Sequence, residues 1–238
     1  MGVEIRRQPK PTKVMEFKVE LVKLTDLKSH EEIIPAGLED FKINVVKDGI
    51  VKHPMIVDKN SMLVLDGHHR KNGLLELGFI NAPAILIDYY DDDLVDLDTW
   101  YPRIKADPMT FLSELKKLDF TVEELKGEFP IKSLKNREIT AVVGNNKKLW
   151  TVKGVREEMF FLVRERWLDD IIYYDEYSGC LKETLENETS IVAWAYTKKE
   201  VIEHASSGLV YLPKTTRHIV KYLYPNCNYP LSKLDRIE

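Results

Sequence analysis

The fold is decided by the stretch Met62-Leu63-Val64-Leu65-Asp66-Gly67-His68-His69-Arg70. Four apolar residues in a row predict a buried strand, and the Asp66-Gly67 pair predicts the tight turn that ends it. The leucines at positions 74, 75 and 77, followed by Gly78, then predict a helix that ends at a glycine. A helix start presents unpaired backbone N–H groups and the positive end of the helix dipole, which favour anions. With two histidines and an arginine beside it, we expect this turn to bind phosphate.

Two other interpretations of this polar turn are open. Asp66 could cap the helix, with both histidines simply at the surface. Alternatively the histidines could bind a metal, but adjacent side chains point about 100° apart on a helix, so His68 and His69 suit a single metal poorly. An ionised Asp66 only accepts hydrogen bonds, and beside a phosphate it therefore needs a cation. Mg²⁺ meets that need, because it binds a few carboxylates together with phosphate oxygens.

A second basic cluster lies near the end of the chain, in Pro213-Lys214-Thr215-Thr216-Arg217-His218. Arginine offers phosphate a planar fork and lysine a point charge, and the threonine hydroxyls add neutral donors. A solvated basic turn is the alternative interpretation. If the cluster folds back onto the turn after Leu65, the two clusters together could hold a polyphosphate.

A carboxylate pair and a tryptophan complete the candidate residues. Glu31 and Glu32 lie in a predicted loop between a strand and a helix, where functional sites often form. Such a pair is often only solvated, but phosphoryl transfer to a hydroxyl needs a carboxylate that orients the hydroxyl and accepts its proton. Trp100 is either a packing residue or a ligand contact. The acidic run Asp91–Asp98 lacks the glycine and terminal glutamate of a calcium loop, so we interpret it as a solvated linker.

The composition indicates a globular chain of 238 residues with a net charge of -4. This acidic balance argues against nonspecific nucleic-acid binding, which usually needs a basic face. The N-terminus lacks an apolar leader, and no apolar run approaches the roughly 20 residues that span a bilayer. We therefore expect a cytoplasmic protein with no membrane partner. Cys180 and Cys227 form no CxxC pair, and we interpret both as structural thiols.

The order of strand and helix patterns predicts an α/β chain of two domains. The composition changes after Pro102, and Asp107-Pro108 then starts a new helix, so we expect domains at 1–104 and 105–238. The patterns Thr121-Val122-Glu123-Glu124 and Thr197-Lys198-Lys199-Glu200 are capping boxes that predict further helices. Residues 1–14 are polar, basic and proline-containing, and we expect a loosely ordered arm there.

Three of these segments together resemble a known family. Asp66 to Arg70, about 35 residues after Ser29-His30-Glu31, is similar to the motif of the ParB/sulfiredoxin-type nucleotide-binding fold. With Thr99-Trp100-Tyr101-Pro102 and the 213–218 cluster added, the chain resembles the free L-serine kinases of archaea, which make O-phospho-L-serine from serine with ATP or ADP. The resemblance implies a ParB/sulfiredoxin-like N-terminal domain and a smaller C-terminal α+β domain. The tail of that second domain, 213–218, would return to the active-site cleft.

The resemblance also implies a role for each candidate residue. Glu31 would be the catalytic base for the serine hydroxyl, and Asp66 would help to hold Mg²⁺ or the reacting groups. Trp100, Glu32 and Arg217 would bind serine. The phosphates of ATP or ADP would be bound by the two basic clusters, which comprise Gly67, His68, His69, Arg70, Lys214, Thr215, Thr216, Arg217 and His218.

Other members of the superfamily differ from this chain in informative ways. Sulfiredoxins carry their nucleophilic cysteine where this chain has His68, which argues against their chemistry. ParB partition proteins, which bind CTP and DNA, carry a Glu-Arg-Arg motif that this chain lacks. The segment Pro35-Ala36-Gly37-Leu38 lacks the acidic residue that the resemblance to the serine kinases implies at this place, so Glu32 is expected to take its part in holding the serine amino group.

We therefore expect a magnesium-dependent serine kinase of serine and cysteine metabolism. Its partners would be L-serine and an adenine nucleotide, with no nucleic acid, and it would be a monomer or a small homo-oligomer. Two alternatives stay open at this point. One is a non-catalytic, nucleotide-binding regulatory protein, and the other is a ParB-like, DNA-associated protein that binds CTP.

Overall fold

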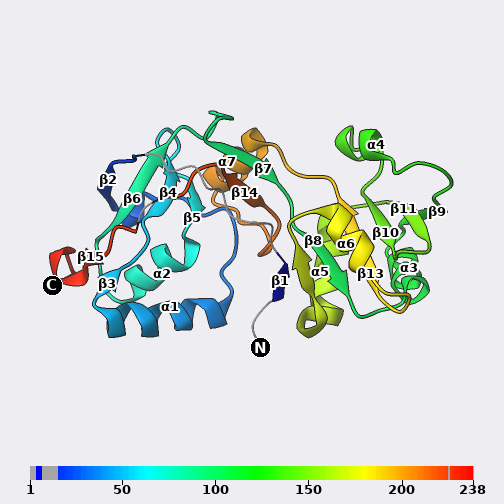
Figure 1. Ribbon diagram of the computed structural model, residues 1–238, viewed down its shortest axis with the longest axis horizontal. Helices are drawn as coiled ribbons and strands as arrows, with labels where there is room; N and C mark the ends of the chain where they lie inside the picture. Colours follow the sequence, from blue (N-terminus) through cyan, green and yellow to red (C-terminus); the bar gives the residue numbers. More distant parts are fainter. Residues whose placement is uncertain (1–3, 7–15, 225, 238) are drawn as a thin grey trace. The chain divides into compact units, whose positions relative to one another are not determined.

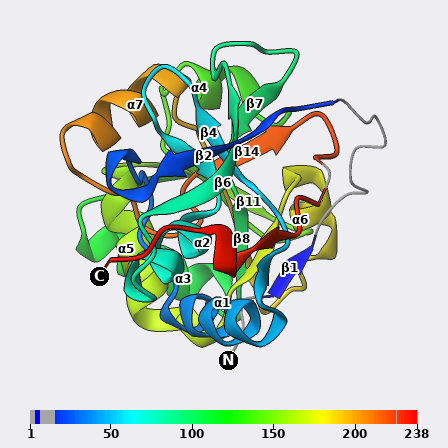
Figure 2. The ribbon, with the colours of Figure 1, turned by 90° about the vertical axis from the view of Figure 1, so that its left-hand side faces the viewer.

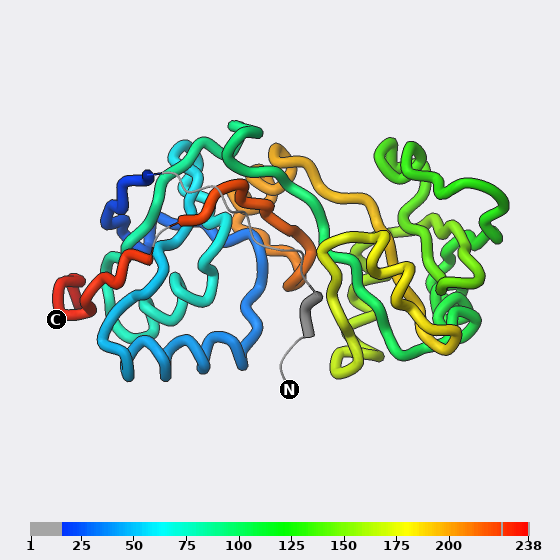
Figure 3. The backbone as a smooth tube through the Cα atoms, in the orientation of Figure 1, coloured from blue at the N-terminus to red at the C-terminus, as the bar shows by residue number. Residues whose placement is uncertain are grey.

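The computed structural model describes residues 4–6, 16–224 and 226–237, and the chain divides into two compact units. The flanking unit comprises Lys10–Asp98 and Tyr196–Glu238, and the central unit comprises Met1–Pro9 and Thr99–Ala195. Figure 3 traces the chain out of the flanking unit after residue 98 and back into it at residue 196. The single division at 104/105 suggested by the sequence differs from these units, because the last segment packs with the N-terminal half. Most of the expected arm, residues 1–3 and 7–14, lies outside the described residues.

The flanking unit is built on a four-stranded sheet in the order β2-β6-β4-β5, in which only β4 and β6 are parallel neighbours. Its strands are β2 (Val19–Lys23), β4 (Met55–Asp58), β5 (Val64–Asp66) and β6 (Asn81–Ile87). Two antiparallel ribbons join it, namely β7 (Val95–Asp98) with β14 (Arg217–Val220), and β3 (Ile50–Val51) with β15 (Tyr229–Pro230). The helices are α1 (Pro35–Asp48), α2 (His68–Glu76) and α7 (Lys198–Ser206), with 3-10 turns at Leu24–Asp26 and Leu231–Lys233.

Both faces of this sheet are buried. Successive residues of a strand point to opposite faces, and neighbouring residues of β4 pack into two different core clusters. Met55 packs in a cluster with Val45 of α1 and Leu74 of α2, whereas Ile56 packs with Val201 of α7. Helices α1 and α2 therefore cover one face of the sheet and α7 covers the other (Figure 1, Figure 2). Burial on both sides explains why the two inner strands, β4 and β6, are mostly apolar rather than alternating, whereas the edge strand β2 contains the charged residues Glu20 and Lys23.

The stretch from Met62 to Arg70 forms the strand, the turn and the start of the helix that its sequence predicts. Strand β5 ends at Asp66, Gly67 has φ 115°, and α2 begins at His68. A Cβ atom on Gly67 would lie 2.8 Å from Cγ of Met55 and 2.9 Å from Nε of Arg70. The backbone conformation and the close packing thus both require glycine at the turn.

The central unit is a seven-stranded sheet in the order β1-β12-β8-β13-β10-β11-β9, antiparallel except for the β1–β12 pair. Its strands are β1 (Glu4–Arg6), β8 (Tyr101–Ile104), β9 (Thr121–Glu124), β10 (Ala141–Gly144), β11 (Leu149–Lys153), β12 (Ile172–Tyr174) and β13 (Thr189–Ala193). Its helices are α3 (Pro108–Lys117), α4 (Ile131–Lys135), α5 (Arg156–Trp167) and α6 (Tyr177–Glu183). A 3-10 turn, Leu168–Asp170, follows α5 directly. Cys180 of α6 is buried in the core of this unit, and burial raises its thiol pKa to about 12. In the described part of the chain, no helix has both the length and the apolar character needed to cross a membrane.

One of the two predicted capping boxes is wrong. Thr121–Glu124 forms β9, which pairs with β11 at the edge of the central sheet. Strand pairing supplies the backbone hydrogen bonds there, and this tertiary contact overrides a short local helix signal. The second box is confirmed, because Thr197 and Glu200 exchange side-chain and backbone hydrogen bonds at the start of α7.

Candidate functional site

The carboxylate of Glu31 is held by the segment 213–218. Its Oε1 accepts hydrogen bonds from the backbone N–H of Thr216 (2.5 Å) and from the Thr216 hydroxyl (2.6 Å). Its Oε2 accepts one from the backbone N–H of Lys214 (3.1 Å), a residue with a left-handed φ of 68°. Residues 183 positions apart in the sequence thus meet at one carboxylate, within the flanking unit.

The surroundings of Glu31 favour a basic carboxylate. Although part of the residue is exposed, burial of the carboxyl raises its pKa above the ordinary value of 4.5. The hydrogen bonds from Thr216 and Lys214, and the charge of Lys214, act in the opposite direction without cancelling this effect. Glu31 is therefore fixed in orientation and accepts a proton more readily than a glutamate in water does.

Three histidines pack together beside this carboxylate and connect the two basic clusters. The ring of His30, which is 1% exposed, lies 4.5 Å from the ring of His68 and 4.9 Å from the ring of His218, both edge to face. Nε2 of His68 accepts a hydrogen bond from the backbone N–H of His30 (3.4 Å). Nε2 of His218 lies 2.7 Å from the hydroxyl of Tyr89. The start of α2 and the 213–218 segment therefore form one site.

Burial keeps these three histidines neutral. It is the largest cause of the lowered pKa of His30 and His218, and it lowers the pKa of His68 to about 3. Placing a second positive charge beside the other histidines of the cluster or beside Lys71, Arg70 and Lys198 is also unfavourable, which lowers these pKa values further, whereas the Asp66 carboxylate opposes the shift at His218. The histidines can donate or accept hydrogen bonds at physiological pH, but positive charge in this region has to come from the lysine and arginine side chains.

The first turn of α2 contains buried side-chain nitrogens that lack protein partners. Within the described residues, neither Nε2 of His69 nor Nε of Arg70 has a hydrogen-bond partner, although both atoms are buried. Gly37 of α1 packs against His69, since a Cβ atom there would lie 3.0 Å from its Nε2. The NH2 group of Arg70 contacts the Asp66 carboxylate at 2.5 Å. Because an unsatisfied buried polar atom is costly, these atoms mark the place where a polar ligand would improve the hydrogen bonding.

The remaining predicted residues are spread over both units. Glu32 is exposed, and its backbone N–H donates to the carbonyl of Tyr211 (2.9 Å). Thr215 is buried, and Arg217 lies 4.0 Å from the Asp98 carboxylate where β14 pairs with β7. Trp100 belongs to the central unit, where it is buried directly before β8.

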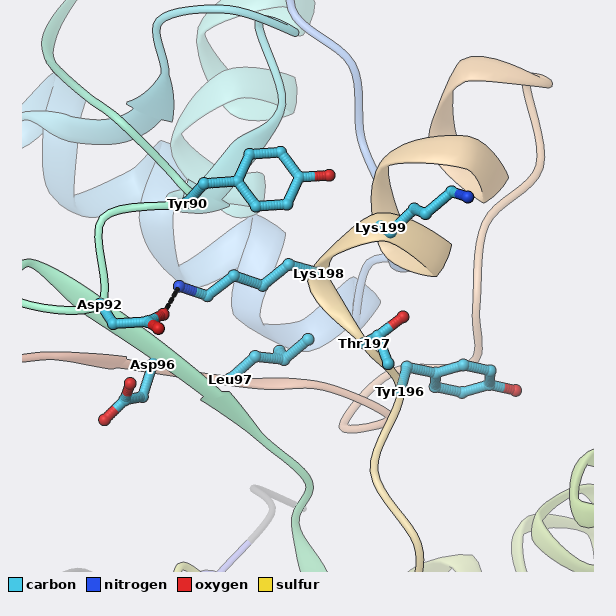
Figure 4. A pocket seen from close by; sticks show the side chains of 8 residues that line it. All are labelled: Tyr90, Asp92, Asp96, Leu97, Tyr196, Thr197, Lys198 and Lys199. Atoms are coloured by element: carbon cyan, nitrogen blue, oxygen red, sulfur yellow. Dashed lines mark hydrogen bonds and ion pairs between the residues drawn. The ribbon is translucent and has the colours of Figure 1, made fainter. Parts of the chain in front are cut away.

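A pocket of about 420 Å³ opens beside β7 and the start of α7 (Figure 4). Its lining comprises Tyr90, Asp92, Asp96, Leu97, Tyr196, Thr197, Lys198 and Lys199. Nζ of Lys198 donates to Oδ1 of Asp92 and to the carbonyl of Val95, both at 2.7 Å, and lies 5.4 Å from the ring centre of Tyr89. The interpretation of Asp91–Asp98 as a solvated linker is therefore wrong, because half of the run is a paired strand and two of its aspartates form a pocket wall.

Sequence patterns assign no role to His30 or to Tyr89, which both contact the site. The position of His30 next to Glu31 is the available signal for it, whereas two tyrosines after a strand give no signal for Tyr89. The structure likewise offers no preformed metal cage, because the described residues include no group of three or more His, Cys, Asp or Glu side chains suited to a metal. The carboxylate of Asp66 is 63% exposed and is the one candidate ligand from the sequence.

Comparison with known proteins gives a consistent result. No protein-family model matches the chain. The chain is 35% identical over 230 residues to an ATP-dependent L-serine kinase of Staphylothermus marinus, with 90% of each chain covered. It is 33% identical over 237 residues to an ADP-dependent L-serine kinase of Thermococcus kodakarensis, covering 93% of this chain and 95% of the relative.

A solved structure agrees with these relatives. A free serine kinase in complex with AMP superimposes with a TM-score of 0.80 at 27% sequence identity, covering 98% of this chain and all of that one. The mixed α/β fold expected from the sequence is thereby confirmed, and so is the resemblance on which that expectation rests.

Proposed function

The chain belongs to the L-serine kinase family, and we propose that it transfers a phosphoryl group from ATP or ADP to the hydroxyl of free L-serine. The product would be O-phospho-L-serine, in serine and cysteine metabolism. The observation that carries the proposal is the Glu31 carboxylate, which is fixed by the 213–218 segment beside the start of α2, where unpaired backbone N–H groups favour anions. A proton acceptor and a phosphate site in one unit are what phosphoryl transfer to an alcohol requires.

Glu31 would orient the serine hydroxyl and accept its proton as the oxygen attacks the terminal phosphorus. Its raised pKa supports this role, because a base works best when its pKa lies closer to the working pH. Its three hydrogen bonds hold the carboxylate in one orientation, so little reorganisation is needed at the moment of reaction.

The phosphates would bind at the start of α2 and along the 213–218 segment. Backbone N–H groups of a helix start favour anions, and the buried Nε of Arg70 is an N–H donor that a phosphate oxygen can satisfy. Nε2 of His69 is a second buried polar atom beside it that has no partner among the described residues. We assign the phosphate contacts to the two basic clusters named from the sequence. Lys214 and Arg217 would supply positive charge, and the Thr215 hydroxyl and the neutral histidines would supply uncharged contacts, whereas the Thr216 hydroxyl is already bonded to Glu31.

Asp66 would hold Mg²⁺ together with the phosphates. A single exposed carboxylate suits this ion, because Mg²⁺ is usually bound by one or two carboxylates and substrate phosphates rather than by an all-protein cage. When bound, the ion would neutralise charge on the phosphates of the donor.

Within the flanking unit, serine itself would be bound by Glu32 and Arg217, with the Glu32 carboxylate meeting the amino group. The exposure of Glu32 leaves its carboxylate accessible to a small ligand. We also propose that the protein acts in the cytoplasm, where its nucleotide co-substrate is found, as a monomer or a small homo-oligomer and without nucleic acid.

The proposal is tested by incubating the protein with L-serine, Mg²⁺ and ATP, ADP or CTP in turn, and measuring phosphoserine by mass spectrometry. We expect phosphoserine with ATP, ADP or both, and none when serine is omitted. No phosphoserine with any donor would refute the kinase assignment. CTP turnover combined with salt-dependent DNA binding would instead support a ParB-like protein.

A further inference from the structure

A chain of hydrogen bonds runs through the site from a buried histidine to the carboxylate. Nε2 of His30 lies 2.9 Å from the Thr216 hydroxyl, and that hydroxyl lies 2.6 Å from Oε1 of Glu31. His30 is 1% exposed and Thr216 is 5% exposed, so both contacts are shielded from water.

The chemistry of these groups fixes the direction of the chain. An ionised carboxylate only accepts hydrogen bonds, so the single hydroxyl proton of Thr216 is donated to Glu31. The Thr216 oxygen can then only accept from His30. We infer that Nε2 of His30 carries the proton, as in a neutral imidazole of the Nε2–H tautomer. Nδ1 of His30 is buried without a hydrogen-bond partner among the described residues, and the backbone of Val64 also acts on the ring, so the tautomer needs a direct measurement.

The two oxygens of Glu31 are left unequal by this arrangement. Oε1 accepts two hydrogen bonds, both from Thr216, whereas Oε2 accepts one, from the backbone of Lys214. A carboxylate oxygen has two lone-pair sites. Among the described residues, Oε1 is thus saturated and Oε2 keeps one site for a further proton donor.

We propose that His30 is a positioning residue for Glu31: it holds the Thr216 hydroxyl on Oε1, so that Oε2 is the atom that takes the proton of serine. This inference rests on the proposed function. In the step it describes, the serine O–H bond breaks and its proton binds Oε2. The freed electron pair of the serine oxygen forms the new P–O bond, and the bond to the leaving nucleotide breaks with its electron pair on the departing phosphate oxygen.

Several titratable groups face this chain and have to be considered in a pH experiment. The rings of His68 and His218 pack on His30, the charge of His204 also acts on His30, and Lys214 acts on Glu31. All four groups are present in every variant described below, so differences between variants report on the His30 chain itself.

The first test compares His30→Phe with His30→Gln in the intact chain. Phenylalanine keeps an aromatic ring but has no donor, whereas the glutamine amide can present an N–H near the position of Nε2. Freed from His30, the Thr216 hydroxyl is no longer held on Glu31, and the pKa of Glu31 rises because that hydrogen bond lowers it. We expect kcat/KM for serine to fall about tenfold in His30→Phe, with its acid limb shifted to higher pH, while the Kd of ADP changes less than threefold.

Three comparisons make this result specific. His30→Gln should restore most of the activity and the original acid limb. In a Thr216→Val background, His30→Phe should produce no further shift, because the hydroxyl it acts through is absent. His53→Phe, at an exposed histidine of the same unit, should leave the acid limb unchanged. An unchanged acid limb in His30→Phe, or a full additional shift in the Thr216→Val background, would overturn the positioning role.

The second test needs no kinase activity. Long-range ¹H–¹⁵N NMR of the unaltered chain at pH 7 distinguishes the histidine tautomers, and we expect His30 to carry its proton on Nε2. A proton on Nδ1 would overturn the inference. A chain that makes no phosphoserine would refute the proposed function, whereas an active chain with the Nδ1–H tautomer would refute the positioning role alone.

Discussion

Glu31→Gln changes the proposed base with little change in shape, and the structure indicates what it should cost. The amide oxygen can keep both hydrogen bonds from Thr216, but the amide NH2 then faces the backbone N–H of Lys214, which is also a donor. The substitution therefore removes the proton acceptor and leaves one N–H without its partner. An unsatisfied group costs about 1–3 kcal/mol, against a typical stability of about 5–15 kcal/mol, so the variant should fold.

The catalytic loss should be much larger than the structural one. General-base catalysis contributes about 10²–10⁴-fold, which corresponds to about 3–5 kcal/mol in the activation free energy. We expect kcat for phosphoserine formation to fall by at least 100-fold. The Kd of ATP or ADP should change only a few-fold, because no phosphate contact is assigned to Glu31.

The assay combines phosphoserine measurement by mass spectrometry with nucleotide titration in a calorimeter. Glu20→Gln, at an exposed position of β2, is the matched control and should match the unaltered chain in both measurements. A kcat within tenfold of the unaltered value would show that Glu31 is not the base. A nucleotide Kd raised more than tenfold would place Glu31 among the phosphate contacts instead.

Further predictions concern binding, the α2 turn and pH. Arg217→Ala should weaken nucleotide binding about 10- to 100-fold by calorimetry, since it removes a charged hydrogen-bond donor. Lys221→Ala, directly after β14, should leave binding unchanged, and equal losses in the two variants would argue against a specific role for Arg217. Gly67→Ala should lower the free energy of unfolding in urea by more than Gly49→Ala does. Both glycines have a positive φ, but of the two only position 67 would bring a Cβ atom within 4 Å of other atoms. Equal losses of unfolding free energy would contradict the packing argument. The pKa of His68 is lowered from 6.5 to about 3, so the stability that its neutral form provides is present above pH 6.5 and is lost as the pH falls, by roughly 2 kcal/mol at pH 5. The difference in unfolding free energy between pH 7 and pH 5 should therefore shrink in His68→Asn, and an unchanged difference would refute the assignment.

The parts of the fold that sequence patterns predict correctly are those with a local cause. The strand, turn and helix around Gly67 follow from an apolar run, a glycine and a helical period that all lie within one short segment. The end of α1 follows in the same way from Gly49, which adopts the left-handed conformation. Each signal depends only on neighbours in the chain, so it can be read without knowing the tertiary structure.

The parts that sequence patterns miss depend on distant partners. Thr121–Glu124 looks like a helix start but is held as a strand by β11, and Val95–Asp98 looks like a solvated linker but pairs with β14. The role of His30 is hidden for the same reason, because its hydrogen-bond partner Thr216 lies 186 residues away. A propensity or a motif contains no information about such a partner.

Under the proposed function, the neutral histidines would allow one site to hold both a base and a polyphosphate. A protonated imidazole beside Glu31 would lower the pKa of the carboxyl and weaken it as a proton acceptor. Burial of His30, His68 and His218 prevents this, because it lowers their pKa values and keeps the rings uncharged. Positive charge for phosphate is then left to lysine and arginine side chains such as Lys214 and Arg217. In the proposed mechanism, the folding of the 213–218 segment onto Glu31 would therefore add phosphate-binding groups to the site without surrounding the proposed base by charged histidines.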